Sequence, residues 1–271
     1  MTDEYLEANR LHWDEAVPIH AASQSYDVAG FKAGRIKLHP LELSELGDVK
    51  GKTMLHLQCH FGLDTLSWAR LGAVVTGMDF SPAAIQQARA LASELQIEAR
   101  FIESTVYDLQ AVLDETFDIV FTSYGVIGWL PDLTLWAEVA ARYVKPGGTF
   151  YIAEIHPMAF TLDDSPGVLE PRLHYPYFEG GPAIATTEGG TYADRNARLI
   201  HDTSYNFAHS LGEVVTSLID AGLQVEFHHE HPFSVTRHGD LAIKGGDEYH
   251  HLRSAEGMVP MLFSLRAKKP A

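Results

Sequence analysis

A regular alternation of strand and helix patterns between residues 51 and 155 constrains the fold more than any other feature of the sequence. Short runs of apolar and β-branched residues are each followed by an amphipathic segment, and Gly72 ends the first helix. Ser81 followed by Pro82 is a strong start signal for the second helix. This alternation predicts a parallel sheet with helices on both faces and right-handed crossovers. The expected strands are 53–58, 73–79, 99–104, 117–123 and 149–155, and the expected helices are 62–72, 82–95 and 132–144.

The segments before and after this region are less regular. Residues 1–50 predict a helical arm, in which Pro18 interrupts the apolar stripe and 25–34 forms a loop. Residues 156–209 contain several prolines, paired glycines and many aromatic residues. They predict an insertion of loops and short strands, whose aromatic side chains form either a lid over the ligand or a small core of their own.

The C-terminal part, residues 210–271, returns to a regular pattern. Ser210 and Glu213 form a capping box at the start of a helix. The β-rich segments 223–235 and 259–267 are expected to complete the sheet as an adjacent antiparallel pair. We therefore expect one α/β domain built on a doubly wound, mostly parallel sheet of seven strands, with one antiparallel strand near its edge.

Composition excludes several classes of protein. The net charge of −16 argues against a protein that binds nucleic acid or anionic membranes, because both need a basic surface. No apolar run approaches the roughly 20 residues that span a bilayer, and the acidic N-terminus does not resemble a signal peptide. Cys59 is the single cysteine and cannot form an intrachain disulfide. We expect a soluble cytoplasmic protein, whose oligomeric state the sequence does not specify.

The segment 55–85 predicts a site for a nucleoside. Its second strand ends at Asp79, 21 residues after Gln58, where a carboxylate can accept hydrogen bonds from both hydroxyls of a ribose. The loop after the first strand contains one glycine, Gly62, and the chain has neither a G-x-G-x-x-G nor a P-loop motif. This loop suits a ligand that carries a nucleoside but no phosphates.

Five motifs in this region resemble those of the class I S-adenosylmethionine-dependent methyltransferases. The resemblance covers residues 51–155, and in the first motif His56 replaces the family's acid while Gln58 and His60 replace two of its glycines. The motifs are LHLQCHFG (55–62), VTGMDFSPAAI (75–85), ESTVYDL (103–109), FDIVFTSYGVIGWL (117–130) and VKPGG (144–148).

The resemblance implies a Rossmann-like methyltransferase fold, S-adenosyl-L-methionine as cofactor and a set of cofactor contacts. Asp79 would bind the ribose, Gln58 and His60 would border the methionine end, and Tyr26 would reach the cofactor from the N-terminal arm. Cys59 lies in the same loop and is expected to be a small packing residue. The implied cofactor-binding residues are Tyr26, Gln58, Cys59, His60, Gly62, Asp79, Phe80, Thr105, Val106, Ser123 and Tyr124.

Histidines supply the candidate catalytic residues. His156 follows the fifth strand and could take a proton from the acceptor, or it could simply hydrogen-bond the backbone ahead of Pro157. His209 and His174 are the next candidates. The histidines in 228–231 and 250–251 allow a metal site, but we expect a half-exposed strand and no metal.

The predicted function is methyl transfer from S-adenosylmethionine to a small-molecule acceptor, at oxygen or nitrogen. The sequence leaves open the identity of the acceptor and whether a general base is used. Two alternatives remain at this point. One is a non-catalytic S-adenosylmethionine-binding protein, and the other is an NAD(P)-dependent oxidoreductase on a related fold, against which the one-glycine loop argues.

Overall fold

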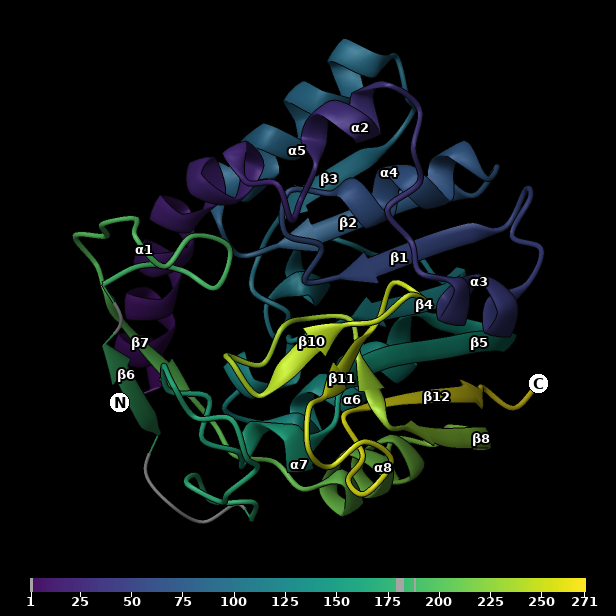
Figure 1. Ribbon diagram of the computed structural model, residues 1–271. Helices are drawn as coiled ribbons and strands as arrows, with labels where there is room; N and C mark the ends of the chain where they lie inside the picture. Colours follow the sequence, from purple (N-terminus) through teal and green to yellow (C-terminus); the bar gives the residue numbers. More distant parts are fainter. Residues whose placement is uncertain (1, 179–182, 188) are drawn as a thin grey trace.

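A seven-stranded mixed sheet forms the centre of the computed structural model, which describes residues 2–178, 183–187 and 189–271. Its strand order is β3-β2-β1-β4-β5-β12-β8, in which only β12 runs antiparallel to its neighbours (Figure 1). This arrangement confirms the predicted α/β fold and the antiparallel C-terminal pair. The strands are β1 (Thr53–Leu57), β2 (Val74–Asp79), β3 (Arg100–Glu103), β4 (Phe117–Ser123), β5 (Val144–Ile155), β8 (Gln224–His231) and β12 (Leu262–Lys268).

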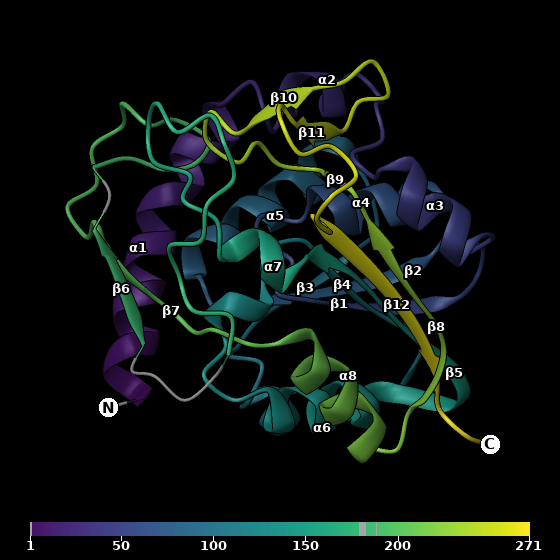
Figure 2. The ribbon, with the colours of Figure 1, turned by 60° about the horizontal axis from the view of Figure 1, so that its bottom comes forward.

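Helices cover both faces of the sheet. Side chains alternate between the faces along each strand, so in β1 Met54 packs beneath α3 and α4, whereas Leu55 and Leu57 pack against α6 and α8. Figure 2 shows α6 and α8 on one side of the sheet and α3, α4 and α5 on the other. The helices are α1 (Thr2–Ala22), α2 (Val28–Lys32), α3 (Pro40–Leu46), α4 (Leu63–Arg70), α5 (Pro82–Leu95), α6 (Leu133–Tyr143), α7 (Pro157–Phe160) and α8 (Leu211–Asp220). None of the helices described here is long and apolar enough to cross a membrane.

Two small sheets accompany the central sheet. The insertion after β5 carries a hairpin of β6 (Ile184–Thr187) and β7 (Thr203–Asn206), and β7 lies along α1 (Figure 1). A second small sheet has the order β10-β11-β9. Its strands are β9 (Phe233–Ser234), β10 (Ala242–Lys244) and β11 (His250–Leu252). Among the paired glycines noted in the insertion, Gly180 and Gly181 lie outside the described residues.

The N-terminal arm is helical as expected, but it differs in detail. Pro18, expected to interrupt the apolar stripe, lies inside α1, which continues through it to Ala22 with contacts to the rest of the protein on both sides of the proline. The expected loop 25–34 contains the short helix α2, which begins after Asp27. The Asp27 carboxylate accepts a hydrogen bond from the Gly30 N–H and so caps this helix. A third difference is that β5 begins at Val144, five residues earlier than expected.

Two side chains that pack closely against Gly77 of β2 make this position sensitive to substitution. A Cβ at this position would lie 2.8 Å from Cys59 Sγ and 2.9 Å from the Phe101 ring. We expect Gly77→Ala to lower the free energy of unfolding by about 1–3 kcal/mol, as overpacking of a closed core does. Urea unfolding measures this change. Gly246→Ala is the matched control, since its Cβ would meet nothing within 4 Å, and equal stability of the two variants would contradict the packing described here.

Candidate cofactor and acceptor site

The carboxyl ends of β1, β2 and β4 bring the predicted cofactor residues to one edge of the sheet. β1 pairs in parallel with both other strands, with His56 opposite Gly77 and Leu57 opposite Thr122. The loop after β1, Asp79 at the end of β2 and Ser123 at the end of β4 therefore lie side by side. This is the edge at which open α/β sheets bind their ligands.

Two residues of the loop after β1 that are not glycine adopt backbone conformations that favour glycine. Gln58 and His60 have φ values of 55° and 49°, in the left-handed region that glycine adopts freely and other residues adopt at a cost. Gly62 follows at φ 80°, where a Cβ would come within 2.8 Å of the Phe101 ring. Gln58 and His60 thus hold backbone conformations that usually favour glycine.

Asp79 fixes this loop to the start of α5. Its Oδ2 accepts a hydrogen bond from the His60 N–H at 2.8 Å, and its Oδ1 accepts one from the Ser81 N–H at 3.0 Å. The side chain is buried, and burial raises its pKa to about 6. Ser81 caps α5 as the sequence predicted, accepting a hydrogen bond from the Ala84 N–H.

The residues after β3 divide between the site edge and the core. Thr105 donates a hydrogen bond through Oγ1 to Asp108 Oδ2 at 2.7 Å, which forms a local turn. Val106 is buried and belongs to the hydrophobic core that also contains Leu57. Phe80, at the turn after β2, is half-buried.

A polar network joins the loop after β1 to the end of β4. Gln58 Nε2 donates to the Val126 carbonyl at 3.2 Å, while its buried Oε1 has no hydrogen-bond partner among the described residues. Ser123 Oγ donates to Asp64 Oδ2 at 3.2 Å and also lies 3.2 Å from His56 Nε2. Burial raises the pKa of Asp64 to about 6 and lowers that of His56 to about 3, so His56 is neutral.

Cys59 is a packing residue, as expected. Its side chain is buried against Gly77 and the Phe101 ring, and burial raises the pKa of the thiol well above its usual value. A thiol in such surroundings is a poor nucleophile. Its backbone N–H donates to the Met78 carbonyl at 2.8 Å, which pairs the loop with the end of β2.

Two buried glutamates, which were not predicted from the sequence, lie on the other side of this edge. Tyr124 donates a hydrogen bond to Glu42 Oε2 at 2.6 Å, and burial raises the pKa of Glu42 to about 8. Glu154, near the end of β5, accepts backbone N–H donors from Gly125, from Val126 at 2.8 Å, and from the next residue at 3.1 Å. Glu154 therefore holds the loop after β4 in place. A lone acid in the apolar strand TFYIAEI is the signal that could have revealed it.

The two histidines proposed for acid–base chemistry both have occupied ring nitrogens. His156 Nδ1 accepts from the Met158 N–H at 2.9 Å, and its Nε2 lies 2.9 Å from Glu230 Oε1. His209 Nε2 lies 2.7 Å from the Leu130 carbonyl oxygen, and its Nδ1 lies 3.0 Å from a carboxylate oxygen of α8. This geometry favours the backbone-capping role for His156 and a structural role for His209.

His174, His229 and His251 each contact a different partner. His229 Nδ1 lies 2.8 Å from Glu45, and His251 Nε2 lies 3.0 Å from Asp247. His174 packs against the ring of Tyr175 within the insertion. Among the described residues there is no group of three or more histidine, cysteine or acidic side chains placed to hold a metal ion.

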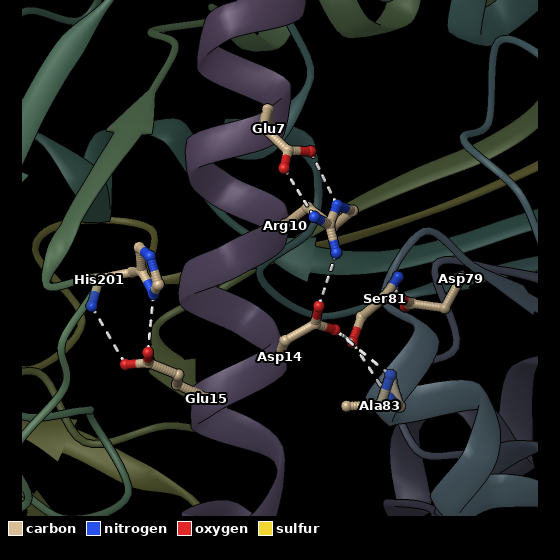
Figure 3. A network of polar contacts seen from close by, with 9 residues as sticks. Glu7, Arg10, Asp14, Glu15, Asp79, Ser81, Ala83 and His201 are labelled. Carbon is tan, nitrogen blue, oxygen red and sulfur yellow. Dashed lines mark hydrogen bonds and ion pairs between the residues drawn. The ribbon is translucent and has the colours of Figure 1, made fainter.

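Helix α1 crosses the start of α5 beside Asp79. Figure 3 shows Asp14 accepting hydrogen bonds from Ser81 Oγ at 2.6 Å and from the Ala83 N–H at 3.3 Å, while Arg10 pairs with its other oxygen at 2.8 Å. The Asp14 carboxylate of the arm thus accepts hydrogen bonds from the start of α5. The arm thus lies beside the edge of the sheet that carries Asp79.

Five aromatic side chains gather where the arm meets the loop after β1, and we refer to them as the arm cluster. Two come from α1, one from the loop that follows α1, one from the loop after β1 and one from the insertion. His20 Nδ1 lies 3.1 Å from His60 Nε2, and the hydroxyls of Tyr26 and Tyr192 are hydrogen-bonded to each other. The predicted contact residue Tyr26 is therefore beside the cofactor loop. The members are Trp13, His20, Tyr26, His60 and Tyr192.

Comparison with known proteins agrees with this geometry. The family model of a methyltransferase domain matches residues 55–152. The chain is 35% identical over 155 residues to a ubiquinone biosynthesis O-methyltransferase of Alkalilimnicola ehrlichii, which covers 55% of this chain and 62% of that protein. It is 32% identical over 146 residues to the protein of the same name from Xanthomonas oryzae pv. oryzae, covering 52% and 61%. The chain thus spans about three fifths of the length of these curated relatives.

A solved structure shares the fold over most of the chain. The S-adenosylmethionine dependent methyltransferase from Mesorhizobium loti superposes with a TM-score of 0.62 at 19% identity, covering 88% of this chain and 100% of that one. The strand order is that of a doubly wound α/β protein. Residues 55–152 match the methyltransferase-domain family, and their fold is shared with the S-adenosylmethionine dependent methyltransferase from Mesorhizobium loti.

Asp64 makes the stability of the protein depend on pH. Because burial raises its pKa from 3.8 to about 6, its ionised form is disfavoured in the folded state, and stability falls as pH rises through this window. We expect Asp64→Asn to be more stable than the natural protein by about 1–3 kcal/mol at pH 8, with little difference at pH 3.5. Urea unfolding at both pH values measures this. Asp114→Asn, at a side chain that is 98% exposed, is the control, and equal pH profiles for the two variants would refute the assignment.

Substitution of His209 distinguishes a structural role of this residue from a catalytic one. His209→Ala leaves the Leu130 carbonyl without its partner, so we expect the free energy of unfolding to fall by about 1–3 kcal/mol. Denaturant unfolding measures the loss, and calorimetry should find cofactor affinity unchanged. A variant of natural stability with strongly reduced turnover would instead support the acid–base role.

Proposed function

We propose that this protein is an enzyme that transfers the methyl group of S-adenosylmethionine to a small-molecule acceptor. One observation carries the proposal. The buried carboxylate of Asp79 lies at the end of β2 and is joined through the His60 N–H to a left-handed loop at the end of β1. The ubiquinone biosynthesis O-methyltransferases that this chain resembles support a small organic acceptor.

The residues at this edge fit the cofactor. Asp79 is an acceptor for ribose hydroxyls, and Gln58 Oε1 is a buried acceptor without a partner among the described residues. An ammonium donor on the methionine portion would satisfy such an oxygen. The loop has none of the glycine-rich phosphate cradle that a dinucleotide needs, which is the reason we prefer this cofactor to NAD(P).

The chain contributes binding and orientation. S-adenosylmethionine, when bound, supplies an already activated methyl group. Asp79 and the loop after β1 would hold it, while Tyr124 and the loop fixed by Glu154 would form the wall toward the acceptor. Helix α1, which is hydrogen-bonded to the start of α5, and the insertion would exclude water from this edge.

We propose that the acceptor atom is an oxygen or a nitrogen. Its methylation would not require a histidine such as His156 as general base. Both ring nitrogens of His156 and of His209 are occupied, so proximity and orientation would carry the reaction. The charge of −16 supports a small molecule over nucleic acid. Incubation with methyl-labelled cofactor and extracts of the native host tests this. Labelling of a low-molecular-weight product is expected, and binding without any transfer would favour the non-catalytic alternative.

Cofactor binding tests the assignment of Asp79. Asp79→Ala removes charge-assisted hydrogen bonds to the ribose, so we expect the dissociation constant of S-adenosylmethionine to rise at least tenfold, or about 1.4 kcal/mol. Isothermal titration calorimetry measures it. Asp114→Ala, remote and exposed, is the control and should bind as the natural protein does. An unchanged affinity in Asp79→Ala would show that the ribose binds elsewhere.

A further inference from the structure

The proton of the acceptor needs a group that can receive it. A hydroxyl acceptor loses its proton when its oxygen is methylated, and orientation of the reactants does not by itself take up that proton. The candidate histidines His156 and His209 both have occupied ring nitrogens. At the end of β4, however, the hydroxyl of Tyr124 is hydrogen-bonded to the buried carboxyl group of Glu42. A hydroxyl joined to a carboxyl group in this way can move a proton.

Backbone pairing fixes Tyr124 at the edge where the ligand is expected. Its N–H donates to the Ala153 carbonyl of β5 at 2.9 Å, and the next residue is held by Glu154. Tyr124 is half-buried, whereas Glu42 of α3 is not exposed at all. The Tyr124 hydroxyl donates to Glu42 Oε2 at 2.6 Å, a length typical of a hydrogen bond to an ionised acceptor. The pair thus joins the ligand edge of the sheet to a carboxyl group that is shielded from water.

The side chain of Glu42 does more than its place in α3 requires. Its Oε1 accepts a hydrogen bond from the His39 N–H at 2.6 Å, which is the capping interaction at the start of the helix. Glutamine serves this cap as well as glutamate does, and a neutral amide is less costly to bury than a carboxylate. The chain nevertheless has an acid here, and its second oxygen bonds to Tyr124. The acid therefore points to a proton that is taken up and released.

The groups around Glu42 leave it able to titrate close to neutral pH. Burial raises the pKa of Glu42 to about 8, the hydrogen bond from Tyr124 opposes this rise, and the negative charge of Asp64 adds to it. Burial lowers the pKa of His39 to about 4 and raises the pKa values of the neighbouring tyrosines, so these side chains are neutral. The titratable groups that face the pair are His39, Asp64 of α4, Tyr151 of β5 and Tyr249 before β11, and Lys37, Lys244 and His250 lie near His39.

We propose that Tyr124 and Glu42 form the acid–base pair of the methyl transfer and that the acceptor is a hydroxyl group. This inference rests on the proposed function. Tyr124 is the catalytic residue that touches the acceptor, and Glu42 acts through it as a positioning residue. The pair thereby supplies the general base that neither candidate histidine can provide.

The step is balanced in protons and electrons. The acceptor proton passes to Tyr124 Oη while the Tyr124 hydroxyl proton passes to Glu42 Oε2. The electron pair freed on the acceptor oxygen forms the bond to the methyl carbon, and the pair of the broken carbon–sulfur bond stays on sulfur. Once the methylated product has left, Glu42 returns its proton to water through Tyr124.

The first measurement follows the proton on Glu42 without any acceptor. Carbon-13 NMR of protein labelled at its glutamate carboxyl groups gives a titration curve for Glu42, identified as the signal that Glu42→Gln removes. We expect a midpoint near pH 8, which Tyr124→Phe moves to higher pH because the ionised carboxyl group loses a donor. Glu45→Gln is the matched control, since Glu45 lies on the same helix and accepts from the Tyr151 hydroxyl at 2.8 Å. It should leave the curve of Glu42 in place.

The second measurement is the rate of methyl transfer as a function of pH. The substrates are methyl-labelled S-adenosylmethionine at saturating concentration and the low-molecular-weight fraction of an extract of the native host. With the natural protein the rate should rise with pH and level off above about pH 8, because only ionised Glu42 can accept a proton. Glu42→Gln and Tyr124→Phe should each lower the rate by about 10²–10⁴-fold and abolish this rise. Glu45→Gln should keep the natural rate and profile.

The possible outcomes separate this inference from the proposed function. Calorimetry should find the natural affinity for S-adenosylmethionine in Glu42→Gln, and thermal unfolding should show it folded, because glutamine keeps the cap. A natural rate independent of pH, a natural rate in either pair variant, an equal loss in Glu45→Gln, or an unmoved Glu42 titration in Tyr124→Phe would each overturn the pair and leave methyl transfer standing. If the natural protein neither binds S-adenosylmethionine nor forms a labelled product, the proposed function fails and this inference fails with it.

Discussion

Parallel pairing of β1 with strands on both sides is the constraint on which the rest of the structure depends. With β2 and β4 as its two neighbours, the ends of three strands must open at the same edge. The polar residues that follow those strands are therefore brought together by backbone hydrogen bonding alone. Such a sheet also needs apolar cover on both faces, which α3, α4 and α5 provide on one face and α6 and α8 on the other.

Buried carboxylates then hold the irregular segments at that edge. Asp79 and Glu154 each accept several backbone N–H groups, and they fix the loops after β1 and after β4, respectively. Loops that emerge from a rigid sheet would otherwise be free to move, and their left-handed residues would be costly to keep. Burial raises the pKa of both carboxyl groups and so disfavours their ionised forms. The order of this edge is therefore kept at a cost in the free energy of folding.

Local signals allowed most of the fold to be predicted. The alternation of patterns gave the sheet, and the Ser81–Pro82 start signal gave α5, because each depends on neighbouring residues only. Contacts between distant segments could not be predicted in this way. Glu42 meets Tyr124 across 82 residues, and His156 meets Glu230 across 74. A histidine at the end of a strand looks the same in sequence whether its nitrogens are free or occupied, and only the fold decides between these states.

The anchoring of α1 has a consequence for the timing of a catalytic cycle. Toward the insertion, Asn9 exchanges two hydrogen bonds with the backbone of Tyr205, and Glu15 binds the backbone and ring of His201. Toward the core, the hydrogen bonds of α1 to α5 run through the single carboxylate of Asp14. The first helix and a hairpin nearly 200 residues later are therefore tied to each other. Opening the arm would require the Asp14 hydrogen bonds to α5 and the His20–His60 contact to break together, and that step would set an upper limit on the rate of turnover.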